Sequence, residues 1–137
     1  MKKGFTLLEL IVVIIVLGVI MSIALPQYFK VVERSRTSEA VNVLGILRAA
    51  QVRYYAQNSA FTNDINDLDV DVTTPTYYDI ALNNPAYAED AVVATLTRNN
   101  VRVPAGYAGY TLTITVNGLI ACSNNADACR ELGYSGG

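Results

Sequence analysis

The side chains that most often perform catalysis or bind transition metals are rare in this chain. Its 137 residues include no histidine and two cysteines. These counts exclude an imidazole base, a Ser–His–Asp triad and a zinc site built from histidine and cysteine. A chain of this length also forms one small domain rather than several. We therefore expect no catalytic residue and no cofactor.

One ionisable side chain stands in an unusual place. Glu9 lies within the apolar run Phe5–Leu25, and a carboxylate inside a membrane costs about 2.5–3.5 kcal/mol. The chain has no basic residue between Lys3 and Lys30 that could pair with it. We therefore expect the partner of Glu9 to come from elsewhere. The free α-amino group of a neighbouring copy would serve, if the chain were cut just before the apolar run.

Two cysteines near the C-terminus form the second candidate site. Cys122 and Cys129 enclose the short polar segment SNNADA. Outside the cytoplasm this pair is expected to form a disulfide, and two free thiols are the alternative. Closing a loop of about eight residues stabilises a fold by roughly 2.5 kcal/mol in the chain-entropy model.

Three alternating carboxylates, Asp67, Asp69 and Asp71, resemble calcium ligands in their spacing. The EF-hand loop needs glycine at position 6 and glutamate at position 12, but counting from Asp67 these positions hold Val72 and Tyr78. We expect a solvated acidic loop and no metal, with a calcium site of another geometry as the alternative.

The charges are divided unevenly along the chain. Residues 1–58 carry a formal charge of +4 and residues 59–137 a charge of −6. The two parts could attract one another between subunits, or the difference could be chance. The acidic part has only three basic residues, so we expect no direct binding of nucleic acid. These residues are Arg98, Arg102 and Arg130.

The apolar run is long enough to cross a membrane. Its 21 residues would form a helix of about 31 Å, which matches a hydrocarbon core of about 30 Å. Lys2 and Lys3 precede the run, so the N-terminal end is expected to stay in the cytoplasm. A secretory signal peptide cut after Ala24 is the alternative, and it would release a soluble binding module.

The segment Lys3–Glu9, with the sequence KGFTLLE, strongly resembles the processing site of type IV prepilins and related pseudopilins. The resemblance implies that a prepilin peptidase removes the leader, residues 1–4, by cutting between Gly4 and Phe5. The same enzyme would then methylate the new N-terminus at Phe5. Glu9 would pair with the N-terminal amine of an adjacent subunit during assembly.

The resemblance extends to Pro26 and Tyr28, which match a helix-bending proline and a following tyrosine in the family. Pro26 removes a backbone donor and crowds the carbonyl of Ser22. Gly18 weakens the helix by about 1 kcal/mol relative to alanine. We expect a kink or local melting of the helix at these two positions.

The resemblance also implies a life cycle. The subunit would be stored in the inner membrane, with lipid around residues 5–25 and its C-terminal part outside the cytoplasm. An inner-membrane assembly platform would then build a homo-oligomeric filament, a type IV pilus for adhesion, motility or uptake. A periplasmic pseudopilus of type II secretion is the alternative, although the usual major pseudopilin lacks the C-terminal disulfide.

After Pro26 the pattern becomes that of an amphipathic helix ending near Asn58. Apolar residues recur at spacings of three and four: Ala40, Val43, Leu47, Ala50 and Tyr54, widened by Val41, Leu44 and Val52. Arg36, Glu39, Arg48 and Arg53 are expected on the other side. We therefore expect one helix over 5–58, divided into an apolar part, 5–25, and an amphipathic part, 26–58.

Residues 59–137 are expected to form a small globular part. A loop or short turn over 61–72 should be held by Phe61, Ile65 and Leu68, and strands are expected at 77–82, 91–97, 110–116 and 119–122. Residues 110–116 alternate apolar side chains with threonine, which predicts one buried and one solvated face. Asn117-Gly118 predicts a two-residue type I′ turn. The expected fold class is α+β, a long helix packed by its back half on a small antiparallel sheet, as in the type IV pilin fold.

Overall fold

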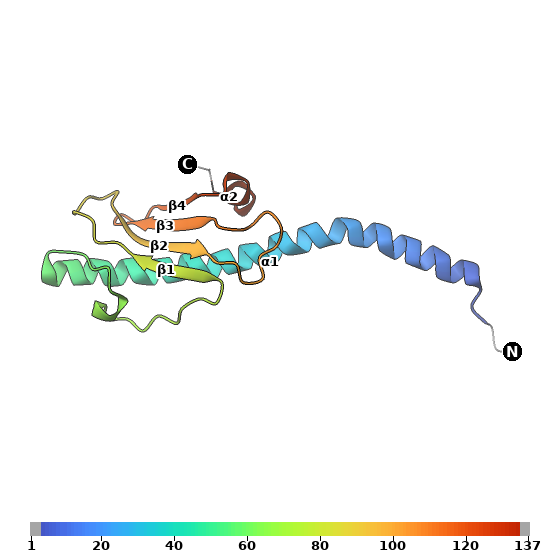
Figure 1. Cartoon of the computed structure of the whole chain (residues 1–137), viewed down its shortest axis with the longest axis horizontal. Coiled ribbons are helices and arrows are strands. Elements are labelled where there is room, and N and C mark those ends of the chain that lie inside the picture. The colour runs from blue at the N-terminus through green and yellow to red at the C-terminus, as the bar shows by residue number, and fades with distance from the viewer. Residues whose placement is uncertain (1–3, 135–137) are drawn as a thin grey trace. The chain divides into compact units, whose positions relative to one another are not determined.

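The computed structural model describes residues 4–134, which form the helices and strands of Figure 1. In chain order these are α1 (Leu7–Asn58), the 3₁₀ helix η1 (Ile65–Asp67), β1 (Tyr78–Leu82), β2 (Val92–Arg98), β3 (Thr111–Thr115), β4 (Ile120–Ser123) and α2 (Ala126–Leu132). The chain divides after Val32 into two compact units. We call residues 4–32 the front segment and residues 33–134 the head unit.

The front segment is helical from Leu7 onward, and none of its side chains is buried. By length and composition, α1 is the one helix among residues 4–134 that could span a membrane. Pro26 lies inside α1 without interrupting it. Local melting at Gly18 or Pro26 is therefore not seen, and a kink at these positions stays a prediction.

The head unit is built on the second half of α1, whose buried residues form one helical stripe. They are Glu33, Thr37, Ala40, Leu44, Leu47, Ala50 and Gln51. Burying each of the two leucines contributes about 1.5–3 kcal/mol. The expected stripe does face the core, but Leu44 is buried, whereas Val43 is only half-buried. The helix ends at Asn58 as expected, because Ser59 takes a positive φ of 56°.

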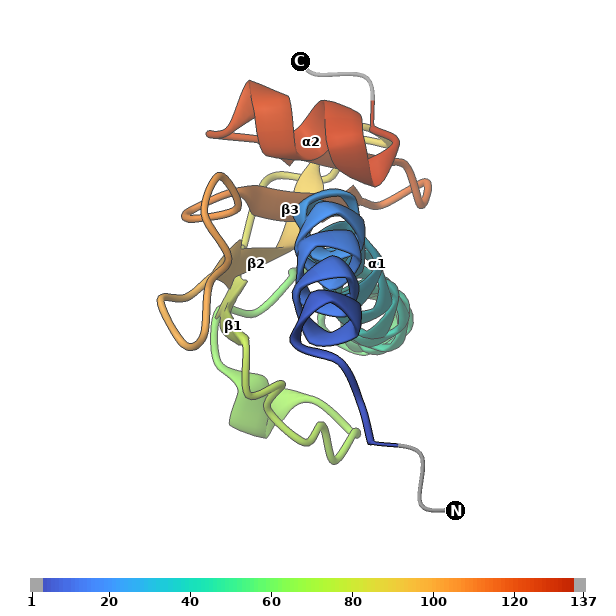
Figure 2. The same cartoon turned by 90° about the vertical axis from the view of Figure 1, so that its right-hand side faces the viewer.

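The four strands form one antiparallel sheet in the order β1-β2-β3-β4. Each strand begins and ends within one residue of its expected range. Figures 1 and 2 show α2 and the η1 segment at opposite edges of this sheet. Strand residues Tyr78, Leu96 and Leu112, and Tyr110 directly before β3, belong to the same core cluster as the apolar stripe of α1, and each is at most 1% exposed. The α+β fold expected from the sequence is confirmed.

The segment after α1 is the loop expected over 61–72. Phe61 and Leu68 are buried, and Ile65 packs against the core. The side chain of Asp64 accepts a hydrogen bond from Asn66 N and so caps η1. The three expected apolar contacts are confirmed.

The expectation of one solvated face on β3 was wrong. Thr111 and Thr115, which we placed on that face, are only 7% exposed. Neighbouring loops cover them, since the side-chain amide of Asn124 donates to Thr111 Oγ1 and the backbone N of Leu119 donates to Thr115 Oγ1. The alternation of apolar and polar side chains along a strand does not show which of these side chains will be covered by neighbouring loops.

The turn between β3 and β4 also differs from the expected type I′ turn. Gly118 has a φ of 93°, but Asn117 is not among the residues with positive φ. Gly118 N donates to Thr115 O at 3.0 Å, and Thr115 N donates to Leu119 O at 3.0 Å. The loop therefore contains three residues, Val116 to Gly118, in the pattern of a turn closed by a glycine bulge. The longer loop allows Val116 to be buried in the core.

The segment between the cysteines is more than a polar loop, because α2 begins within it. The side chain of Asn125 accepts a hydrogen bond from Ala128 N and caps the helix at its start. Gly133 ends the helix with a φ of 98°. The cap at Asn125 and the glycine at position 133 were the signals for this helix in the sequence.

Candidate functional site

The start of α1 is organised by a reciprocal pair of hydrogen bonds. Thr6 N donates to Glu9 Oε2 at 2.9 Å, and Glu9 N donates to Thr6 Oγ1 at 3.2 Å. This is a capping box, in which each side chain satisfies a backbone donor of the other residue. Glu9 therefore has hydrogen-bond partners within its own chain, while the charge partner that we expect from a neighbouring copy stays a prediction. No basic side chain within residues 4–134 forms an ion pair with Glu9, so its charge is not balanced there.

Gly4 and Phe5 precede the first helical residue and are exposed. The peptide bond between them therefore lies outside the helix, where a protease active site could reach it. The remaining leader residues, Met1 to Lys3, lie outside the described residues.

Behind this bond, the apolar side chains of the front segment face outward. From Phe5 to Leu25 the exposed large apolar side chains have exposed fractions between 44% and 79%. Exposure on this scale is far larger than a soluble monomer presents, and it marks a surface made for lipid or for other chains.

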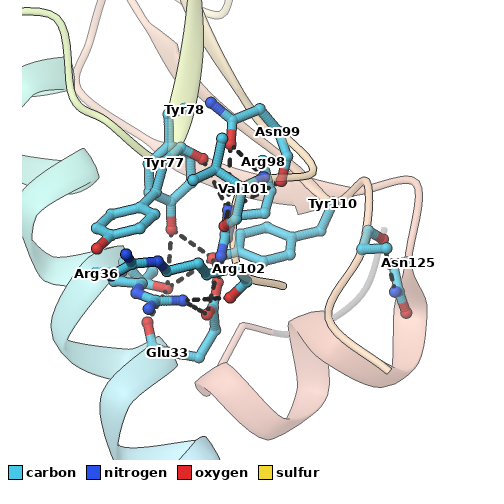
Figure 3. Close-up of polar contacts among 12 residues, drawn as sticks. Glu33, Arg36, Tyr77, Tyr78, Arg98, Asn99, Val101, Arg102, Tyr110 and Asn125 are labelled. Carbon is cyan, nitrogen blue, oxygen red and sulfur yellow. Dashed lines mark hydrogen bonds and ion pairs between the residues drawn. The ribbon is translucent and has the colours of Figure 1, made fainter. Parts of the chain in front are cut away.

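The most elaborate polar arrangement lies in the head unit, where α1 first contacts the sheet (Figure 3). Glu33 is 0% exposed and Arg98, at the end of β2, is 1% exposed. Arg98 Nε donates to Glu33 Oε1 at 2.5 Å. Tyr110 Oη donates to the same oxygen at 3.1 Å, and Arg36 Nη1 donates to Glu33 Oε2 at 3.1 Å. Two arginines and a tyrosine thus surround one buried carboxylate.

Two further groups extend this cluster. The hydroxyl groups of Tyr78 and Tyr110 hydrogen-bond to each other, and Thr37 Oγ1 lies 3.0 Å from Tyr110 Oη. Burial raises the pKa of both tyrosines. In Figure 3 the side chains of Tyr78 and Tyr110 lie beside those of Glu33 and Arg98. The guanidinium carbon of Arg36 lies 4.1 Å from the ring centroid of Tyr77. Arg36 was expected on the solvent side of α1, but it is half-buried.

The remaining donors of Arg98 are also used. Its Nη1 donates to the backbone oxygens of Tyr77, Asn99 and Val101 at 2.9–3.2 Å. Across residues 4–134, no buried side-chain nitrogen or oxygen lacks a partner. A cluster this closed offers no site for substrate, and its effect is to hold α1 in register against β2 and β3.

Sequence reasoning missed this cluster, because it counted Glu33 and Arg98 only as charges. A signal was present for one of them. Glu33 and Thr37 continue the buried series Ala40, Leu44, Leu47 backwards at spacings of three and four, so both positions face the core. No comparable pattern pointed to Arg98, at the end of a strand.

The disulfide between Cys122 and Cys129 is present, with Cα atoms 5.7 Å apart, and this expectation is confirmed. It joins β4 to α2, whose residue Glu131 accepts a hydrogen bond from the hydroxyl group of Tyr107. Burial and this carboxylate raise the pKa of Tyr107 to about 12. The disulfide, which links β4 to α2, holds this last helix against the sheet.

The three alternating aspartates do not converge on one point. Asp67 accepts a hydrogen bond from Thr62 Oγ1 at 2.7 Å. Asp69 accepts two from Arg53, at 2.8 and 2.7 Å, and this arginine lowers the pKa of the Asp69 carboxyl. Within residues 4–134 there is no cluster of three histidine, cysteine or acidic residues that could hold a metal ion.

Comparison with known proteins identifies the family. A family model described as Type IV pilin-like G and H matches residues 37–131, and one described as Prokaryotic N-terminal methylation motif matches residues 1–25. The fimbrial protein EcpC of Eikenella corrodens is 36% identical over 132 residues, which cover 93% of this chain and 86% of EcpC. The chain belongs to the type IV pilin family.

Other pilin relatives match over shorter stretches. The type IV major pilin PilE of Neisseria gonorrhoeae is 34% identical over 64 residues, 47% of this chain and 38% of PilE. The type II secretion system core protein G of Pectobacterium carotovorum is 34% identical over 85 residues, 62% of this chain and 54% of that protein. Pilins are structural subunits that assemble into filaments of pilin copies, and the residues of this pilin that we predicted for assembly lie in the front segment.

Proposed function

We propose that this pilin is a structural, non-catalytic subunit of a type IV pilus. A prepilin peptidase removes residues 1–4 by cutting between Gly4 and Phe5 and methylates the amine of Phe5. Residues 5–25 then hold the subunit in the inner membrane and later form the filament core. Residues 26–58 are the amphipathic part of the helix, and residues 59–137 are the globular part outside the cytoplasm.

The observation that carries this proposal is the exposed apolar surface directly behind the Gly4–Phe5 bond. Large apolar side chains from Phe5 to Leu25 are at least 44% exposed. Each must be covered by lipid before assembly or by other subunits afterwards, because water is an unfavourable neighbour for so large an apolar surface. The head unit, by contrast, has its own core and lacks such a surface.

Assembly adds a requirement at Glu9. Once the leader is removed, the positive amine of Phe5 on an adjacent subunit is a suitable partner for the Glu9 carboxylate, whose hydrogen bonds to Thr6 leave its charge in place. An inner-membrane assembly platform would bring the two together. The finished pilus would serve adhesion, motility or uptake.

A pseudopilus of a type II secretion system is the second candidate. The match to the core protein G of Pectobacterium carotovorum favours it. The match to EcpC covers more of both chains and favours the pilus. The two candidates differ in where the filament lies, since only a pilus extends from the cell surface.

The experiment is intact-mass spectrometry with N-terminal fragmentation on two fractions of the native cells, the sheared surface filaments and the inner membrane. We expect a chain that starts at N-methyl-Phe5 in both fractions and gains two hydrogens on reduction. The same processed chain in the membrane without surface filaments would support the pseudopilus. A soluble chain that starts at Leu25 would contradict both candidates, because it would come from a signal peptide.

A further inference from the structure

An open groove lies on the head unit between the end of α1, the segment before β2 and the β3–β4 loop. Its floor is aromatic: the ring centroids of Tyr55 and Tyr87 lie 5.0 Å apart, and those of Tyr55 and Phe61 lie 4.8 Å apart. Tyr87 is 57% exposed and Val52 is 40% exposed, so both present apolar surface to the groove. We call this the aromatic groove.

The volume of the aromatic groove limits its occupant. It measures about 320 Å³, which is at the lower end of the range for sites that bind small molecules, about 300–1,000 Å³. A helix or a strand of a partner protein would need a longer channel. The groove therefore suits one or two small rings.

Polar side chains line the rim of the aromatic groove, and their hydrogen-bonding capacity is only partly used. Arg48 Nε donates to Val116 O at 2.7 Å, which holds the guanidinium group in place beside Gly118. Its two terminal nitrogens have no hydrogen-bond partner among residues 4–134, and neither has the carboxylate of Glu89. Asn117 uses its oxygen, which accepts from Leu119 N at 3.1 Å, and keeps its amide donors.

We propose that the aromatic groove binds a neutral hexopyranose, such as the terminal sugar of a glycan. The ring of such a sugar has an apolar face of C–H groups that stacks on a tyrosine, and neighbouring hydroxyl groups that both donate and accept hydrogen bonds. Tyr87 provides the stacking surface, Arg48 and Asn117 donate, and Glu89 accepts. Because Arg48 and Glu89 bring opposite charges, the groove has no preference for an anion or a cation.

The test uses the full processed chain in micelles of lauryldimethylamine oxide, since alkyl maltosides carry the sugar rings that the proposal invokes. Methyl β-D-galactopyranoside and methyl β-D-glucopyranoside are titrated while backbone amide NMR shifts are recorded. We expect saturable shifts at Val52, Tyr87 and Asn117 for at least one of the two, with a Kd of about 1 mM, which is typical of a site with few contacts.

Three variants and one control test the assigned contacts. Tyr87→Ala should weaken binding about tenfold, Tyr87→Phe should keep most of it, and Glu89→Gln should weaken it about threefold. Tyr28→Ala removes an equally exposed tyrosine from the front segment and should have no effect, since Tyr28 is 62% exposed. Variants with an unchanged amide spectrum outside the groove retain the fold.

Either of two results would overturn the proposal. One is an absence of saturable shifts for both glycosides up to about 100 mM, a hundred times the expected Kd. The other is shifts at the groove that depend on protein concentration and not on the sugar, which would assign the groove to contact with a second copy. Neither result would affect the proposed role as a pilus subunit, which is tested by the mass of the processed chain.

Discussion

The two halves of α1 differ in how their side chains find partners. The front segment has no buried side chain, although most of its residues are strongly apolar. The second half buries seven, and three of these, Glu33, Thr37 and Gln51, are polar. Among residues 4–134, the helix therefore has a front part that buries no side chain and a second part that buries seven in the head unit.

This difference shows which contacts fix the position of each part of the helix. In the head unit, Gln51 exchanges hydrogen bonds with the backbone of Thr62, at 2.6 and 3.1 Å, and Glu33 pairs with Arg98. Such contacts tolerate little displacement of α1 against the sheet. The side-chain hydrogen bonds of the apolar front segment are local ones, the capping box at Thr6 and Glu9 and a bond from Ser22 Oγ to Val19 O at 2.7 Å, and they do not join it to another element.

The largest predicted effect is at the buried ion pair of the head unit. Glu33→Gln leaves Arg98 buried without a counter-charge, so the free energy of unfolding should fall by about 3–5 kcal/mol. Urea unfolding of the full chain in micelles, followed by the near-ultraviolet circular dichroism of the buried tyrosines, measures it. Asp69→Asn is the matched control, because it removes an exposed ion pair with Arg53 and should have little effect.

A double variant distinguishes destabilisation by an unpaired buried charge from destabilisation by poor packing. Glu33→Leu combined with Arg98→Met removes both charges and should restore much of the lost stability. If Glu33→Gln costs less than about 1 kcal/mol, the ion pair does not contribute as proposed.

The next effect is the loss of the bond between Cys122 and Cys129. Replacing both cysteines by serine should lower the free energy of unfolding by about 2.5 kcal/mol, since the bond closes a short loop. The protection of α2 amides in hydrogen exchange should fall more than that of β1, which lies at the other edge of the sheet. Equal loss of protection at α2 and β1 would contradict a local role for the bond.

The smallest effect is a pH dependence that is confined to alkaline solution. Burial raises the pKa of Tyr78 and Tyr110 in the folded state, so above about pH 10 the unfolded chain loses protons that the folded chain keeps. Stability from these tyrosines is therefore complete below pH 10 and decreases as the pH rises further. Melting curves between pH 7 and 12 measure this change, and Tyr110→Phe should make the alkaline decrease less steep. An equally steep decrease in Tyr110→Phe would exclude Tyr110 as its source.

The sequence was sufficient for the long helix, the four strands and the class of fold, because each of these produces a periodic pattern of apolar residues, but it did not predict α2. Alternation over residues 110–116 placed β3, and the long apolar run placed the front segment. The two cysteines were also identified as a disulfide. These features depend on neighbours in the sequence.

The sequence was insufficient where distant residues decide the outcome. Arg98 is 65 residues from Glu33, and its position at the end of a strand resembles that of any solvated arginine. The burial of Thr111 depends on Asn124, which lies in a loop beyond the next strand. The capping box was visible in the sequence as Thr6-x-x-Glu9. It was missed because Glu9 lies in an apolar run and only its charge was considered.

The most direct test of the account is the yield of sheared filaments from cells that produce Glu9→Gln. Glutamine preserves the capping box with Thr6 and removes only the charge, so loss of local helix structure cannot explain a defect. We predict that the variant is inserted and cleaved after Gly4, with a filament yield at least about tenfold lower than wild type, the factor that corresponds to 1.4 kcal/mol. Wild-type amounts of filament built from chains that start at N-methyl-Phe5 would contradict the claim that neighbouring copies supply the partner of Glu9.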